Sequence, residues 1–258
     1  MKRIDHLVVA VHDLDAAGAL CQRLGFQVGA RNRHPWGTEN RLVQFASSFI
    51  ELITVADPAG IPPHGAGKFS FGAFVRDYLQ RREGLAMLVL DSDDARADAA
   101  RFAAAGIGAF EPFFFERRGR RPDGSETHVA FTLAFANAAP DAAFFVCQQH
   151  FPENFWNPAF QRHENGAANI TAVTLRLPDP ARHRAFLAAF TGDPGAGLIG
   201  GRIEVAAGDD TMFPDFTVAV PDLAAQAARL DAAAIDYDQR DGRLALPAFG
   251  TTLIFEEI

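Results

Sequence analysis

Residues 9–14 read VAVHDL, and residues 218–223 read VAVPDL. In each copy an apolar segment with strand character runs into an aspartate, Asp13 or Asp222, that is placed to cap the N-terminus of a helix. Two copies of one strand-to-helix pattern, near the two ends of a chain of 258 residues, indicate an internal repeat. The repeat has to be identified first, because the whole fold is built from it.

The same pattern occurs twice more in the middle of the chain. Residues 173–179 form an apolar segment that ends in Asp179, and Pro180 suits the first turn of a helix. Residues 85–90 form a looser copy that reaches acidic residues at positions 91, 93 and 94. Apolar side chains at spacings of three and four predict an amphipathic helix after each copy. These helices are expected near residues 14–24, 95–106, 181–192 and 223–234.

Segments with strand character follow each helix. We expect them at residues 26–32, 40–46 and 49–55, at 109–116, 128–136 and 143–149, and at 235–239, 243–246 and 251–256. The third module is shorter, because there is room for about two strands between its helix and the fourth copy. One module cannot cover the apolar face of its own sheet, so modules should pair. The sequence therefore predicts an α+β fold of four βαβββ modules, paired into two cups of antiparallel mixed sheet with flanking helices.

Pairing divides the chain into a first paired-module domain at residues 1–150, a connector at 151–166 and a second, abbreviated domain at 167–258. Two segments of the first domain lie outside the repeat. Residues 58–83 are rich in Pro, Gly and Phe, and are interpreted as a long loop that covers the first cup. The loop would bring some of its phenylalanines near the site: Phe69, Phe71 and Phe74. Residues 117–126 are interpreted as a hairpin tip, either a solvated turn or an anion site.

The composition narrows the class of protein. A net charge of −8 and a pI near 5.4 argue against nucleic acid as a partner, because phosphate binding needs a basic surface. No stretch approaches the 18 to 20 apolar residues that cross a bilayer, and Asp5 and His6 interrupt the N-terminal apolar run that a secretory signal would need. Cys21 and Cys147 form no motif and are expected as buried free thiols. We therefore expect a cytoplasmic protein.

Several segments resemble the vicinal-oxygen-chelate superfamily, which includes glyoxalases, bleomycin-resistance proteins and dioxygenases. The resemblance is carried by DHLVVAV at residues 5–11, DLD at 13–15, LGF at 24–26 and FIELI at 49–53. HPWGTEN at residues 34–40 and CQQHFPE at 147–153 resemble its glyoxalase-like domain subgroup more closely. The resemblance implies cups of the vicinal-oxygen-chelate type, each able to hold a divalent metal with ligands from the first and last strands of each module.

By position, His6 and Glu51 fall on the two ligand places of the first module. Imidazole and carboxylate are suitable ligands for Zn²⁺, Fe²⁺, Mn²⁺ or Ni²⁺. In the second module the first strand offers only Leu85, Ala86 or Met87, so Gln148 or His150 on its last strand would complete the site. Glu51 could double as a catalytic base. Substrate contacts are expected from polar groups of a probable loop, His34, Thr38, Asn40 and Arg41, and from Phe71 of the covering loop.

The second pair of modules offers less. Asp215 is expected in the register of His6 and Glu256 in that of Glu51, but the third module supplies Ala172 at its matching place. We therefore expect the second half to be a structural duplicate that has lost its site.

Two functional hypotheses follow for the first cup. One is a metal-dependent lyase, isomerase or dioxygenase that acts on a small oxygen-rich substrate. The other is a metal-free protein of the same fold that binds and sequesters a small molecule in a phenylalanine-lined cup. Either implies a small-molecule partner and leaves a homodimer open. The metal content of the purified protein distinguishes the two.

Overall fold

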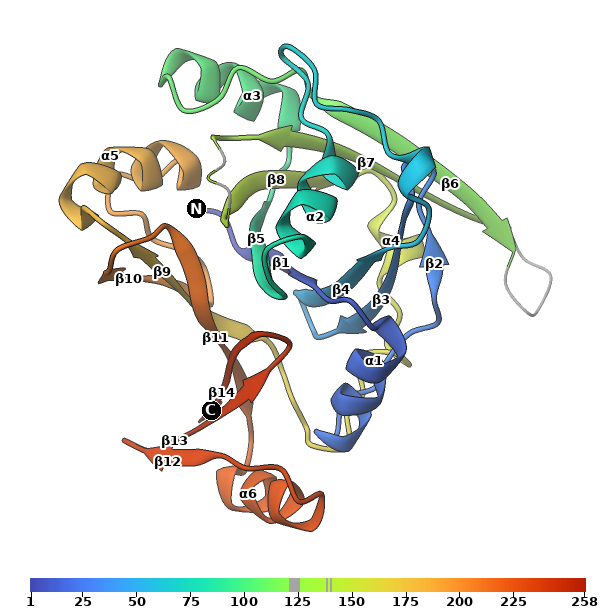
Figure 1. The fold of residues 1–258 in the computed structure, drawn as a ribbon, viewed down its shortest axis with the longest axis vertical. Coiled ribbons are helices and arrows are strands. Elements are labelled where there is room, and N and C mark those ends of the chain that lie inside the picture. The colour runs from blue at the N-terminus through green and yellow to red at the C-terminus, as the bar shows by residue number, and fades with distance from the viewer. Residues whose placement is uncertain (121–125, 138, 140) are drawn as a thin grey trace.

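The computed structural model describes residues 1–120, 126–137, 139 and 141–258. Its first half is built on one sheet of eight strands (Figure 1). From one edge to the other these strands are β2 (Asn32–Arg33), β3 (Thr38–Gln44), β4 (Phe49–Val55), β1 (Ile4–Ala10), β5 (Gly84–Asp91), β8 (Ala143–Gln149), β7 (Glu126–Phe135) and β6 (Phe113–Arg120). The first cup is the concave face of this sheet.

The strand order of the first sheet confirms that two modules are paired. Within each module the first strand lies parallel to the last, β1 beside β4 and β5 beside β8. The two first strands, β1 and β5, meet antiparallel at the centre of the sheet. The order is therefore the same when it is followed inwards from either edge, which is the arrangement that a twofold relation between two βαβββ modules requires.

The second half forms a smaller sheet of six strands, seen at the lower left of Figure 1. In order these are β10 (Arg202–Ala207), β9 (Ile170–Leu177), β11 (Met212–Val220), β14 (Thr251–Glu257), β13 (Arg243–Ala248) and β12 (Asp238–Arg240). The third module has only β10 after its helix, one strand fewer than predicted, because the next module already begins at Met212. The two last modules are still joined antiparallel through β9 and β11.

The four helices of the repeat are present, and an aspartate caps each of them. They are α1 (Leu14–Arg23), α3 (Ala95–Ala104), α5 (Pro180–Thr191) and α6 (Leu223–Ala232). The carboxylates of Asp13, Asp94, Asp179 and Asp222 accept hydrogen bonds from backbone N–H groups of the first turn. Each of these contacts satisfies helix donors that would otherwise lack partners. No helix among the described residues is both long and apolar enough to traverse a bilayer.

The segment at residues 58–83 differs from the loop that its composition predicted. It contains the short 3₁₀ helix at Pro58–Gly60 and the helix α2 (Phe71–Leu79), whose first turn is capped by the hydroxyl of Ser70. In Figure 1, α2 lies over the first sheet, where it contacts β1 and β4. Its side chains, including Phe74, Val75 and Tyr78, pack on the concave face of the first sheet. The segment thus fills one part of the first cup with a helix and leaves another part open.

Two groups of buried side chains hold the molecule together. One group is continuous through both halves and joins the convex face of the first sheet to the apolar face of the second, with Val9 and Leu52 in one and Val173 and Phe216 in the other. The second group lies inside the first cup and includes the α2 contacts. The short helix α4 (Pro152–Phe155) of the connector adds Phe155 to the edge of this group.

Candidate functional site

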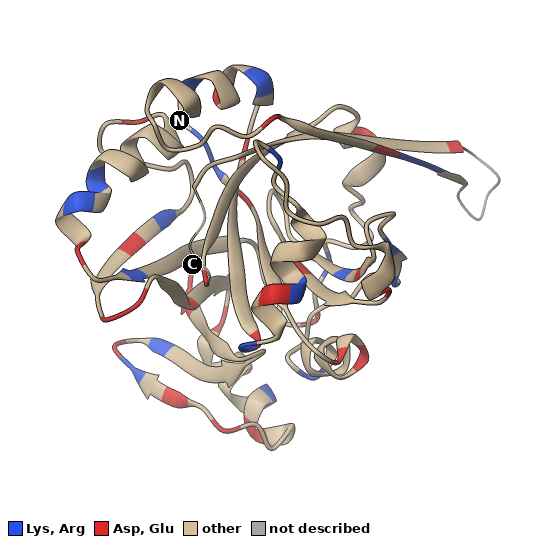
Figure 2. Cartoon of the chain, turned by 45° about the horizontal axis from the view of Figure 1, so that its top comes forward, with Lys and Arg blue, Asp and Glu red and all other residues tan. Residues whose placement is uncertain are grey.

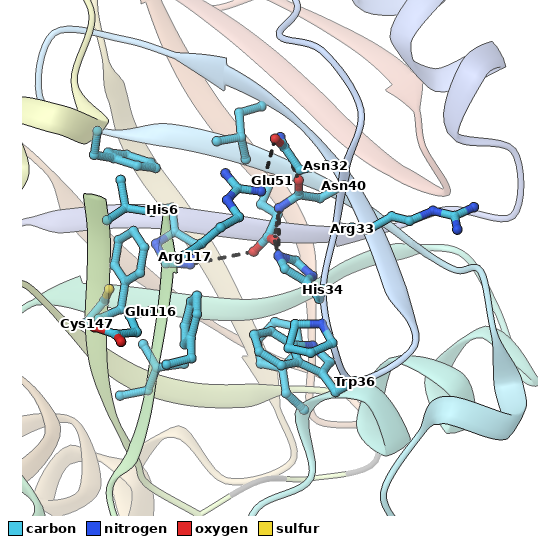
Figure 3. Close-up of a pocket in the computed structure, with 18 of the residues that line it drawn as sticks. His6, Asn32, Arg33, His34, Trp36, Asn40, Glu51, Glu116, Arg117 and Cys147 are labelled. Atoms are coloured by element: carbon cyan, nitrogen blue, oxygen red, sulfur yellow. Dashed lines mark hydrogen bonds and ion pairs between the residues drawn. The ribbon is translucent and has the colours of Figure 1, made fainter. Parts of the chain in front are cut away.

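The open part of the first cup is a cavity of about 150 Å³ (Figure 3). Aromatic rings form a large part of its wall, among them Trp36, Phe49, Phe71, Phe115, Phe131 and Phe145. An engineered apolar cavity of similar volume holds a benzene molecule. The cavity is therefore the size of one ring, with a few polar groups to orient what enters it.

His6 is held by the residue that precedes it. Its Nδ1 lies 2.5 Å from Oδ1 of Asp5, and Oδ2 of Asp5 accepts a hydrogen bond of 2.9 Å from Nε2 of Gln149. Both His6 and Asp5 are buried. With Asp5 ionised, the ring proton sits on Nδ1 and the lone pair on Nε2. The Phe49 ring stacks on the imidazole with a centroid distance of 4.3 Å, which fixes its plane.

A strand irregularity makes the contact between Asp5 and His6 geometrically accessible. Neighbouring residues of a regular strand point to opposite faces, so their side chains would not meet. Ile4 pairs with Leu90 and His6 with the adjacent Val89, which leaves Asp5 as an extra residue on β1. Such bulges redirect side chains and occur often beside functional sites.

Glu51 is the central acceptor of the polar network. One of its oxygens, Oε1, accepts a hydrogen bond of 2.5 Å from Nδ2 of Asn40 and lies 3.8 Å from Nε2 of His34. The other, Oε2, lies 3.9 Å from Nε2 of His6. The carboxylate is buried. It therefore stands between two imidazoles, one from β1 and one from the turn between β2 and β3 (Figure 3).

His34 approaches the network from the turn that joins β2 and β3. Its Nδ1 lies 2.8 Å from the hydroxyl oxygen of Thr38, and its ring stacks on Trp36 with a centroid distance of 4.6 Å. Burial lowers the pKa of His34, while the charge of Glu51 opposes this change. Desolvation is the larger cause, so His34 favours the neutral form at neutral pH.

Five of the predicted residues therefore line one cavity: His6, His34, Asn40, Glu51 and Phe71. Thr38 does not line this cavity, but it orients His34. Phe69 and Phe74, also predicted near the site, pack deeper against Phe135 and Tyr78, so Phe71 alone of the three borders the open cavity.

The predicted places of Gln148 and His150 need correction. Gln148 caps the start of α3, because its Oε1 accepts from the backbone N–H of Ala95 and its Nε2 donates to the carbonyl of Asp93. His150 lies 2.8 Å from the hydroxyl of Thr132. Neither lines the cavity, which from β8 receives Phe145 and Cys147. The prediction grouped Gln148 and His150 on one face, but that face is the convex one.

Arg41 is also absent from the cavity. Its guanidinium donates to Asp15 at 2.8 Å and to the carbonyl of Gly29 at 3.2 Å. It alternates along β3 with Asn40, which faces the cup, so it points to the opposite side of the sheet.

The second module carries no polar counterpart of His6 and Glu51. His6 lies seven residues before the aspartate that caps α1, and Met87 lies seven before the one that caps α3. On the last strands, Phe49 pairs with His6, and Ala143 pairs with Met87. Glu51 lies two residues after Phe49 and Phe145 lies two residues after Ala143, so Phe145 corresponds to Glu51. Met87 and Phe145 are fully buried apolar side chains.

These residues do not fit the metal centre that the sequence implied. Two of its four ligand places hold Met87 and Phe145, neither of which binds a hard divalent cation. One oxygen of Glu51 is already bound by Asn40. In the part of the chain that the structure describes, no three or more His, Cys, Asp and Glu side chains are grouped so that they could hold a metal ion.

In the second sheet Asp215 falls in the register of His6, as expected, but Glu256 does not fall in that of Glu51. Asp215 lies on β11 opposite Thr252, so Ile254 corresponds to Glu51 and Glu256 lies two residues beyond. Asp215 accepts from the Thr174 hydroxyl at 2.5 Å, and burial raises its pKa. Glu256 instead accepts hydrogen bonds from Arg202.

Three residues of the candidate site were missed from the sequence. Asp5 was missed because strand alternation places it away from His6, and only the bulge brings them together. Trp36 borders the cavity, and its buried Nε1 has no hydrogen-bond partner among the described residues. Arg117 also borders it. A signal for Arg117 existed, since the segment at 117–126 was considered as an anion site; residues 117–120 belong to β6, and residues 121–125 lie outside the described part.

A family model described as glyoxalase-like domain matches residues 4–191. No curated protein matches the chain. Among solved structures, a hypothetical protein from Staphylococcus aureus covers 100% of both chains at 13% identity, with a TM-score of 0.69. A mutant of 4-hydroxymandelate synthase from Streptomyces coelicolor matches 99% of this chain and 92% of its own at 13% identity, with a TM-score of 0.59.

A third similar structure is the Mn(II)-bound glyoxalase from Novosphingobium aromaticivorans. It matches 100% of this chain and 83% of its own at 14% identity, with a TM-score of 0.55. At these identities the solved structures establish the fold, and the site has to be interpreted from its own residues.

Proposed function

The chain belongs to the glyoxalase-like domain family of the vicinal-oxygen-chelate superfamily, and from this premise we propose that its first cup binds a small carbonyl compound and moves a proton on it without a metal. The reaction class is an isomerase or a lyase. One observation carries the proposal: the buried Asp5 holds Nδ1 of His6 and leaves Nε2 of the same ring beside Glu51 in the cavity.

His6 has the arrangement of a general base. A neutral imidazole whose Nδ1–H is bound to a carboxylate can accept a proton at Nε2, and the carboxylate then stabilises the cation. The proton would come from a C–H bond next to the carbonyl of the ligand, and the electron pair would move onto the carbonyl oxygen. Protonated His6 would lie between Asp5 and Glu51, and it could return the proton at another carbon or to a leaving group.

Glu51 would assist by charge. It is buried, oriented by Asn40, and lies beside the ring nitrogen of His6 that would carry the proton. The aromatic wall keeps the site poor in water, which strengthens these electrostatic interactions. The Trp36 indole N–H, which lacks a partner among the described residues, is a suitable donor to an oxygen of the ligand.

A second candidate is sequestration of a small molecule without turnover. It is favoured by the stacking of Phe49 on His6, which limits movement of the ring, and by the apolar residues at the second module's equivalent positions. In that case His6 and Glu51 would only hydrogen-bond the ligand.

Solvent exchange tests the proposal without knowledge of the product. A panel of small ketones, aldehydes and 2-oxo acids is incubated with the protein in D₂O, and loss of the C–H signal next to the carbonyl is followed by NMR. The variant His6→Gln should lower the exchange rate by about a hundredfold or more, the usual effect of losing a general base. His150→Gln is the matched control, because His150 lies outside the cavity and should leave the rate unchanged.

Three outcomes contradict the proposal. Equal exchange with wild type and His6→Gln would remove His6 from the chemistry. Binding of panel members without exchange would favour sequestration. Metal at one equivalent in the purified protein, lost in His6→Gln together with activity, would overturn the metal-independent reaction.

A further inference from the structure

A second, larger cavity of about 320 Å³ lies next to the ring-sized one. Five residues line both cavities: Asn32, Leu42, Arg117, Val129 and Phe155. The two cavities therefore adjoin along these five residues. A ligand that extends beyond one ring can continue from the inner cavity into the outer one, provided that these side chains accommodate it.

Arg117 is the charged group at this junction. It lies on β6, and its Nη1 donates a hydrogen bond of 3.2 Å to Oδ1 of Asn32 (Figure 3). No carboxylate of the described residues forms an ion pair with it. The nearby charges are matched elsewhere, since Arg33 pairs with Glu39 and Glu116 with His128. Arg117 thus presents donors and a positive charge that the protein itself does not neutralise.

Arg117 differs from other arginines without an acidic partner because it lines both cavities. Figure 2 shows acidic and basic residues scattered over the molecule, and the chain as a whole carries a net charge of −8. A guanidinium binds carboxylates through two parallel hydrogen bonds, a geometry that a single amide oxygen such as that of Asn32 does not use fully.

We propose that Arg117 binds the carboxylate of an elongated ligand, whose ring-sized apolar part fills the inner cavity and whose chain passes between the two cavities. The inference rests on the proposed function, because it assigns the substrate class of the same site. That class is a ring-bearing or branched carboxylic acid with its reactive carbon near His6. A neutral molecule of the same shape would leave Arg117 unmatched.

A matched pair of probes tests the proposal. 3-Phenylpropanoate and 3-phenylpropanamide have nearly the same shape and differ in charge. Their dissociation constants are measured by calorimetry or by ligand-observed NMR, with the full chain at constant ionic strength. Wild type should bind the acid about tenfold more tightly than the amide, as expected for a charge-assisted hydrogen bond.

The variants locate the preference. Arg117→Gln should reduce the ratio of the two dissociation constants to about one, whereas Arg117→Lys should keep part of it because the charge remains. Arg118→Gln is the matched control: Arg118 is the next residue on β6, is exposed as Arg117 is, and does not line either cavity. It should keep the wild-type ratio. Thermal melting confirms that each variant is folded.

Failure of the inference differs from failure of the proposed function. Equal binding of acid and amide to wild type overturns the role of Arg117 and leaves the cavity as a small-molecule site. The same change of ratio in Arg117→Gln and Arg118→Gln reduces the effect to net charge and also overturns it. Absence of binding by both probes contradicts the inference and the proposed small-molecule site together.

Discussion

One position of the repeat has different residues in its four copies. Seven residues before each helix-capping aspartate stand His6, Met87, Ala172 and Asp215. In the first sheet the contrast is sharpest, because β1 and β5 are neighbours and share one concave face. The first module contributes His6 and Glu51 to that face, and the second contributes Met87 and Phe145.

The difference shows that the fold and the site have separate requirements. At this position of the strand the side chain needs suitable contacts in its own surroundings, and the copies differ in the partners that provide them. His6 is bound by Asp5, Met87 packs in the apolar group that includes α2, and Asp215 accepts from Thr174. A module can therefore keep its place in the sheet with either kind of side chain at these positions. The first module has polar side chains there, and the second has apolar side chains that pack.

The largest expected effect tests the packing role of the second module. Phe145 is 1% exposed and lies against Phe71, Phe135 and His6. Phe145→Ala should lower the free energy of unfolding by about 3–5 kcal/mol, because it removes a ring and leaves a cavity. Urea denaturation followed by circular dichroism measures the change.

Phe114→Ala is the control, since Phe114 is 48% exposed and its loss should change the free energy of unfolding by no more than about 0.5 kcal/mol. A small effect of Phe145→Ala, comparable to that of Phe114→Ala, would show that the second module's position is not a packing position.

The fold could be predicted from the sequence because each copy of the repeat is marked by residues that act on their close neighbours in the chain. Asp13, Asp94, Asp179 and Asp222 cap the four helices as expected, and a cap depends only on residues next to it. Helix α2 was missed because Pro and Gly dominate the composition around it. Ser70, its capping residue, was the local signal that could have revealed it.

Only part of the candidate site was predicted, and the reasons for the successes and the failures are physical. His6 and Glu51 were placed by their position in the module, which the fold preserves, and His34 and Asn40 by the polar groups of a probable loop. Gln148 and His150 were misplaced because a two-residue period groups side chains but does not say which group faces the cup. The contact of Asp5 with His6 depends on a bulge, and a bulge changes the period that sequence reasoning relies on.

A smaller effect is expected from the buried polar network of the first module, as a change of folding stability with pH. Burial lowers the pKa of His34, so the unfolded chain binds a proton there before the folded protein does. Stability should therefore fall as the pH drops below the ordinary histidine pKa of about 6.5, with a slope of at most about 1.4 kcal/mol per pH unit from this residue. Urea denaturation between pH 7.5 and about 5 measures the slope.

His34→Gln should flatten this slope relative to wild type. Burial also lowers the pKa of His163, but that residue is present in both proteins, so its contribution cancels in the difference. Parallel pH profiles for wild type and His34→Gln would contradict this prediction. They would mean that the pKa of His34 is no lower in the folded protein than in the unfolded chain, so that the first module accommodates the charged ring.

The smallest expected effect tests whether the second sheet depends on charge as the first cup does. Glu256 accepts hydrogen bonds from Arg202, which lower its pKa, but Arg202 is 39% exposed. Water and salt screen such a pair, so Glu256→Gln should cost less than about 1 kcal/mol at pH 7. Because the folded pKa is depressed, this contribution is present above the ordinary glutamate pKa and disappears as the pH falls through the folded value.

Urea denaturation at low and high NaCl measures the effect, and Glu257→Gln is the control, since Glu257 is the exposed neighbour. A cost of about 3 kcal/mol or more, insensitive to salt, is the scale of a broken buried ion pair. That result would place Glu256 in an environment like that of Glu51 and would remove the distinction between the two sheets. A small, salt-sensitive cost would support the distinction between the two sheets. Glu51 is buried in the first cup beside two histidines, whereas Glu256 of the second sheet pairs with the partly exposed Arg202.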